Sequence, residues 1–138
     1  MSSFDALLAP MPGTEHQKIA GVEIDIARAG TARVKRVIYP PGFRWSTHIK
    51  PVVGTDLCMH SHVGFLARGQ IHMEFADGCT REFVAPQAVL IEPGHDGWVV
   101  GTDPAVLIEF DFVGETAQQL GLPETHRHDH AGGKAGQA

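Results

Sequence analysis

Short apolar runs that are separated by glycine and proline recur along most of this 138-residue chain. The clearest run, Ile-His-Met-Glu-Phe at 71–75, alternates apolar and polar side chains and is followed by a hairpin turn signal, Asp77-Gly78. Nine such runs, at intervals of about 8 to 12 residues, indicate an all-β sandwich or barrel. They predict strands over residues 22–26, 34–39, 43–49, 62–68, 71–75, 80–84, 88–91, 98–100 and 105–112. One short helix is expected at 115–120.

Composition and charge limit the kinds of partner that we expect. With 43% hydrophobic and 20% charged residues, the chain is typical of a soluble globular domain. A formal net charge of −5, with no cluster of Lys and Arg, excludes a nucleic-acid surface. The sequence contains no apolar run of about 18 residues, the length that would predict a membrane span. The N-terminus lacks the basic start and apolar core of a signal peptide, so we expect a cytoplasmic protein whose Cys58 and Cys79 are reduced thiols.

The chain has the length of one domain with its own core. Residues 1–21 are expected to form an N-terminal arm, 22–122 a β-barrel, and 123–138 a disordered tail rich in histidine and glycine. Three of the nine histidines lie in this tail, where a solvated segment is expected more than a metal site. Five histidines belong to the barrel domain, namely His48, His60, His62, His72 and His95.

Two stretches of the chain resemble the two sequence motifs of the cupin family. The first cupin motif is a glycine, five residues, His-x-His, three or four residues, a glutamate, six residues and a glycine. Gly42 precedes His48 at the motif spacing, and Lys50 stands at the second histidine. His62 occupies the glutamate position, with six residues between it and Gly69. Eleven residues separate Lys50 from His62, so this loop is an insertion relative to the motif.

The second cupin motif is a glycine, five residues, Pro-x-Gly, two residues, a histidine, three residues and an asparagine. The stretch after Pro86 follows this spacing, with Gly94 at the second glycine. Gly97 stands where the family has its metal histidine, and His95 lies two residues earlier. In an extended segment, residues two apart share a face, so His95 could point into the same cavity. The resemblance covers residues 34–112.

The resemblance implies the cupin fold, a double-stranded β-helix that forms a jelly-roll barrel. It also implies one divalent metal ion (Fe, Zn, Ni or Mn), a small-molecule ligand in the barrel, and a homodimer that pairs through its sheets. Cupin sites with three histidines are similar to those of dioxygenases, so a metal-dependent dioxygenase or lyase is one expectation. A binding or sensing module without turnover is the alternative, because one fold serves many functions.

The residues themselves support a metal site in the same place. Strand residues of a barrel alternate between the lumen and the outside, so imidazoles from separate strands can converge. His48, His62 and His95 are predicted as ligands, with positions left open for water or substrate. His60 competes with His62, because the two share one face of an extended chain. His72 alternates with apolar neighbours and is expected on the outer face or at an interface.

Other polar residues could support this site. Asp56 and Cys58, in the inserted loop, could reach the metal, although Cys58 also suits a small apolar position. Lys50, Asp56 and Glu92 are the candidates for a general base. Lys50 could instead anchor a carboxylate substrate. Glu92 or Asp96 could hold the second ring nitrogen of a ligand histidine.

Overall fold

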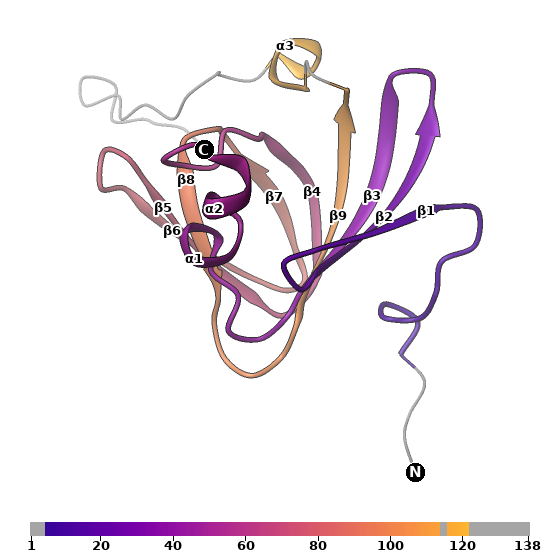
Figure 1. The fold of residues 1–138 in the computed structure, drawn as a ribbon, viewed down its shortest axis with the longest axis horizontal. Coiled ribbons are helices and arrows are strands. Elements are labelled where there is room, and N and C mark those ends of the chain that lie inside the picture. Colours follow the sequence, from indigo (N-terminus) through magenta and orange to yellow (C-terminus); the bar gives the residue numbers. More distant parts are fainter. Residues whose placement is uncertain (1–4, 114–115, 122–138) are drawn as a thin grey trace.

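The computed structural model describes residues 5–113 and 116–121, and over these residues the chain is mostly β-structure (Figure 1). The strands are β1 (Glu15–Ile19), β2 (Val22–Ala29), β3 (Ala32–Tyr39), β4 (His62–Arg68), β5 (Gln70–Phe75), β6 (Thr80–Val84), β7 (Gln87–Ile91), β8 (His95–Val99) and β9 (Ala105–Phe112). The helices are α1 (Trp45–His48), α2 (Lys50–Val53) and α3 (Thr116–Leu120). Within the described ranges, no helix is long and apolar enough to cross a membrane.

The strands form two antiparallel sheets. The larger sheet has the order β1-β2-β3-β9-β4-β7, and the smaller has the order β6-β5-β8. In Figure 1 the smaller sheet faces the larger one across a common interior. Side chains from both sheets fill that interior as one core, with Leu66 and Leu107 from the larger sheet and Ile71 and Phe75 from the smaller. The predicted all-β fold is thereby confirmed.

Strand β9 carries charged side chains into this interior. Ala105, Leu107, Glu109 and Asp111 alternate along the strand and are buried, whereas Phe110 is half exposed on the outer face. This alternation follows from the two-residue period of a strand. Because β9 lies between β3 and β4 in the sheet, its two acidic residues have neighbours on both sides.

The prediction of a strand over 43–49 is wrong, because most of this segment belongs to α1 and the turn into α2. The N–H of His48 donates to the carbonyl of Arg44 at 2.9 Å, which is the hydrogen bond of an α-helical turn. Pro51 lies in the first turn of α2, where its missing N–H costs nothing, and Gly54 ends that helix with a φ of 83°. The helical hydrogen bond, the proline and the glycine favour helices here, and the alternation of apolar and polar residues in this segment is too weak to favour a strand.

A strand that the sequence did not predict lies within the arm expected over 1–21. β1 pairs with β2 through a tight hairpin at Ala20 and Gly21, both of which have positive φ as a two-residue turn requires. β1 has no buried residue, so it lacks the apolar face that reveals a strand in a sequence. The helix expected at 115–120 is confirmed as α3 over residues 116–120, the part of it that the structure describes. The tail expected over 123–138 lies outside the described residues.

Candidate metal centre

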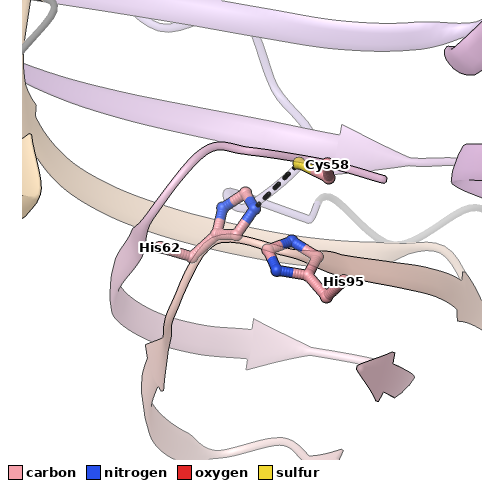
Figure 2. A group of neighbouring side chains, drawn as sticks. All are labelled: Cys58, His62 and His95. Atoms are coloured by element: carbon pink, nitrogen blue, oxygen red, sulfur yellow. Dashed lines mark hydrogen bonds between the residues drawn. The ribbon is translucent and has the colours of Figure 1, made fainter. Parts of the chain in front are cut away.

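Three side chains with metal-binding atoms converge in the interior. Cys58, His62 and His95 each place one donor atom within 4.8 Å of the other two (Figure 2). His62 is the first residue of β4 and His95 the first of β8, so each sheet supplies one histidine. The centroids of these two rings are 5.0 Å apart. Cys58 comes from the loop between α2 and β4.

Backbone hydrogen bonds hold the loop that carries Cys58 against β8. The N–H of Cys58 donates to the carbonyl of His95, and the N–H of Gly94 donates to the carbonyl of Cys58, both at 2.7 Å. Cys58 and His95 therefore form an isolated antiparallel bridge. The loop that the sequence marks as an insertion thus brings a buried thiol beside two imidazoles.

Hydrogen bonding decides which nitrogen of His62 faces this group. Nδ1 lies 2.7 Å from Oε1 of Glu109. A carboxylate only accepts hydrogen bonds, so Nδ1 carries the proton and donates it. Nε2 then faces Sγ of Cys58 at 3.9 Å, the contact drawn in Figure 2. A carboxylate behind a ligand histidine is a common way to orient the ring toward a metal.

The environment favours the form of cysteine that binds metals. Burial alone would raise the pKa of the Cys58 thiol, but the hydrogen bond and charge of His62, with a contribution from His95, lower it to about 5. Burial alone would lower the pKa of His62, but the charge of Glu109 and the contact with Cys58 raise it to about 10. Both shifts favour a thiolate paired with an imidazolium. A divalent cation that displaces the Nε2 proton would meet a thiolate, which is the metal-binding form.

His95 has a buried ring nitrogen that no described residue satisfies. Its Nδ1 donates to the backbone carbonyl of Glu92 at 2.7 Å, which leaves the lone pair on Nε2. This Nε2 is buried and has no hydrogen-bond partner among the described residues. Leaving a buried polar atom unsatisfied costs about 1–3 kcal/mol. Ligation of a cation explains the arrangement, because Nε2 faces Cys58 and His62 (Figure 2).

A network of buried charges on β3 and β9 lies next to these donors. Asp111 faces Arg33 in the strand register, and it accepts from Arg33 and Lys35 at 2.8 Å each. Nε2 of His60 lies 3.2 Å from the same carboxylate. Burial would raise the pKa of Asp111, but His60, Arg33 and Lys35 together hold it well below its usual value. The carboxylate therefore stays ionised, with two cations beside it.

His60, His62 and Glu109 form a second group with metal-ligand spacing. Burial would raise the pKa of Glu109, but His62, with Lys35 and His60, lowers it to about 2. A metal in this group would break the hydrogen bond from His62 to Glu109 and compete with the charge of Lys35. A metal bound by Cys58, His62 and His95 keeps the hydrogen bond to Glu109, so that group is the better metal site.

The donors line a cavity of about 520 Å³ between the sheets. Small-molecule sites are usually about 300–1,000 Å³. Most of the wall is aliphatic or aromatic, with contributions from both sheets, α1 and α2. Apart from the three donors, the titratable side chains in the described lining are Lys35, Tyr39, His60 and Glu109.

The structure brings together two of the three predicted ligands, His62 and His95. His48 lies outside both groups of donors. Its ring stacks on Phe43 with centroids 5.6 Å apart, and its Nδ1 lies 3.1 Å from the backbone nitrogen of Arg44. The physical reason is the helix α1, which replaces the strand that would have carried His48 to the cavity wall. A thiol, not a third imidazole, completes the group.

The three predicted general bases lie outside the cavity lining. Nζ of Lys50 is 3.7 Å from Asp56, whose side chain is fully exposed. The carboxylate of Glu92 pairs with Arg81 at 3.4 Å. Glu92 does hold the second nitrogen of a histidine, but through its backbone carbonyl instead of its side chain.

Two other predicted side chains belong to the surroundings of the site. His72 lies outside both groups of metal donors. Its Nδ1 is 2.7 Å from Oε1 of Glu82, and the centroid of its ring lies 4.4 Å from that of Trp98. Asp96 accepts a hydrogen bond from the backbone N–H of Ser46 and so anchors α1 instead of a ligand histidine.

Lys35 and Glu109 line the site, yet the sequence did not single them out. A signal was present, because Glu109 and Asp111 occupy alternate positions of an otherwise apolar run, which places both on one face of a strand. Acidic residues on the inner face of a central strand need buried partners. Those partners, Lys35 and Arg33, come from a strand far away in the sequence.

The chain matches no family model, and a search of the curated proteins found no similar protein.

Proposed function

We propose that the chain is a cupin-type metalloenzyme that binds one divalent metal ion and acts on a small organic molecule in its barrel. The observation that carries the proposal is the convergence of Cys58, His62 and His95 on the wall of an apolar cavity. The cupin assignment is supported by the motif spacings in the sequence and by two facing antiparallel sheets, the layers of a jelly roll.

The donor set favours a particular kind of metal ion. A thiolate and two imidazoles suit zinc, iron(II) or nickel better than manganese, which prefers oxygen ligands. Three protein donors with a further position for water or substrate are typical of catalytic zinc sites. We therefore expect zinc first among the four ions considered. When bound, the ion supplies a Lewis acid that polarises an oxygen of the substrate.

The surrounding residues orient the donors and exclude water. Glu109 orients the ring of His62, and the carbonyl of Glu92 orients the ring of His95. Such partners make a site more rigid and the donors more basic. The apolar wall keeps bulk water away, so electrostatic interactions in the cavity are stronger than in water.

His60 is the residue best placed to move a proton. It lines the cavity, and its side chain is 35% exposed, so it contacts both the interior and the solvent. Its Nε2 lies 3.2 Å from Asp111 and 3.5 Å from Nζ of Lys35. An imidazole can both donate and accept a proton. His60 therefore takes the role that the sequence assigned to three residues outside the cavity.

A binding or sensing module without turnover is the second candidate. It is favoured by the pairing of both interior carboxylates, Glu109 with His62 and Asp111 with Arg33 and Lys35. Neither carboxylate is then available as a base. The two candidates differ in one measurable property, since an enzyme site needs a coordination position that exchanges with small ligands.

Metal analysis of the full chain tests the proposal, with the three tail histidines between residues 126 and 130 replaced by asparagine. We expect about one zinc ion per chain. Cys58→Ser and His95→Ala should weaken zinc binding by about 100-fold or more, because each removes a donor. His72→Ala is the matched control, a histidine outside the cavity, and should bind zinc normally. Zinc that follows the tail histidines and ignores the barrel substitutions would contradict the proposal.

Cobalt(II) in place of zinc reports the ligands and separates the two candidates. A thiolate-to-cobalt charge-transfer band is expected, and it should disappear in Cys58→Ser. Added azide should shift the visible bands if a coordination position faces the cavity, as an enzyme needs. Visible bands that do not respond to azide would favour the binding module.

A further inference from the structure

We propose that the ligand of this cavity is an apolar molecule with one anionic oxygen group, bound with the anion at the metal and the apolar body toward the mouth. The class covers alkyl and aryl carboxylates, phenolates and enolates. This inference rests on the metal centre proposed above and adds the chemistry of what binds there. Two features carry it, the charge balance at the inner wall and the apolar rim of the cavity.

The inner wall has one excess positive charge when it holds a divalent ion. Its two carboxylates, Glu109 and Asp111, are balanced by two cations of β3. Those cations are Arg33 and Lys35, which both pair with Asp111, and Lys35 also lies opposite Glu109 in the strand register. The thiolate of Cys58 balances one charge of the ion, and histidines bind metals in the neutral form. Because an unpaired buried charge is unfavourable, a monoanion at the ion completes the balance.

The mouth of the cavity is apolar. Val52 and Val53 of α2, Met59 of the following loop and Ile19 of β1 all line the cavity and are exposed to solvent. Four exposed apolar side chains around one opening suit the entry of an apolar molecule. A polar ligand would gain nothing from them.

Polarity increases with burial along the cavity. The donors at the inner wall are buried, and the charged lining residues Lys35 and Glu109 are next to them. The exposed rim carries no charged side chain among the described lining residues. An amphiphilic molecule therefore fits in one orientation only. The volume of about 520 Å³ holds an acyl chain or a small ring system.

Ligand binding can be measured with the two tryptophans of the chain. Trp45 and Trp98 both line the cavity, so their fluorescence reports a ligand there. The probes are octanoate, octanamide and octylamine, which share one alkyl chain and differ in the charge of the head group. Each is titrated into the zinc-loaded full chain and into the metal-free full chain, with zinc content measured separately.

Zinc-loaded protein should bind octanoate at least about tenfold more tightly than octanamide or octylamine, because only the carboxylate compensates the excess charge. Metal-free protein should lose that preference. If zinc binds but the three probes bind equally, or if the preference persists without zinc, the inference is wrong while the metal centre stands. If no zinc binds in the barrel, both proposals fail.

A matched pair of variants tests the orientation of the ligand. Val53 and Val84 are both 54% exposed, but Val53 lines the cavity and Val84 lies on β6 outside it. Val53→Asp places a negative charge at the mouth and should weaken octanoate binding by about tenfold. Val84→Asp should leave octanoate binding unchanged. Equal effects of the two substitutions would overturn the proposed path of the apolar chain.

Discussion

The Nδ1 of His62 donates to Oε1 of Glu109 at 2.7 Å, and this bond turns the other ring nitrogen toward the two remaining donors. The chain repeats the same contact nearer its surface, where His72 and Glu82 are also 2.7 Å apart. Only the buried pair lies beside the proposed metal. The two pairs therefore allow the effect of position to be separated from the effect of the hydrogen bond itself.

The first prediction concerns the orientation of His62. Glu109→Gln keeps the shape of the side chain but removes the charge that orients the ring and increases its basicity. We expect zinc affinity to fall by about 10- to 100-fold, measured by competition with a chelating dye. Glu82→Gln changes the matched pair outside the cavity and should leave the affinity unchanged. Equal affinities in both variants would show that Glu109 has no part in metal binding.

The second prediction concerns the stability of metal-free protein in acid. The folded-state pKa of Glu109 is lowered from 4.5 to about 2, and that of Asp111 is lowered below its usual value. A carboxyl group with a lowered folded pKa contributes stability above its unfolded pKa and loses it as the pH falls toward the folded value. The free energy of unfolding in urea should therefore fall from pH 4.5 toward pH 2. Glu109→Gln should make that fall smaller, and an unchanged slope would contradict the account.

The third prediction concerns the close approach of β4 and β9. A Cβ at Gly64 would lie 1.8 Å from the carbonyl oxygen of Ile108, which is backbone and cannot move aside. Gly64→Ala should therefore lower the free energy of unfolding by about 3 kcal/mol or more. At Gly97 the nearest atom is Sδ of Met73 at 2.6 Å, on a flexible side chain, so Gly97→Ala should cost about 1 kcal/mol. Urea denaturation measures both, and similar losses would contradict this reading.

The fourth prediction concerns the homodimer that the cupin resemblance implies. Val34 and Phe110 are direct partners across β3 and β9, and Phe65 of β4 lies opposite Ile108 on the same outer face. Val34, Phe65 and Phe110 are all exposed, as a sheet-to-sheet contact would require.

We therefore expect a dimer in sedimentation velocity, and a monomer when Phe65→Lys and Phe110→Lys are combined. Val84→Lys changes a similarly exposed residue of the smaller sheet and should leave the dimer intact. A monomeric parent protein at every concentration tested would contradict the prediction.

Much of the strand pattern could be predicted because it depends on neighbours two residues apart. The runs at 71–75 and 105–112 alternate or carry continuous apolar residues, and both are strands. His62 could be predicted for a similar reason, since it begins a run with an inward face. His95 could be predicted because it lies two residues from the histidine position of the second motif. His48 could not be placed in this way, because the segment around it alternates weakly while local hydrogen bonds make it a helix.

By itself, the sequence determined an all-β chain with imidazoles on the inner faces of its strands, since periodicity is a local property of the chain. Only the tertiary structure decided which histidines meet and that a thiol joins them. Cys58 reaches His95 through backbone bonds between a loop and a strand, and His62 finds Glu109 47 residues away. Such pairings depend on how the sheets pack, and no local pattern of residues encodes them.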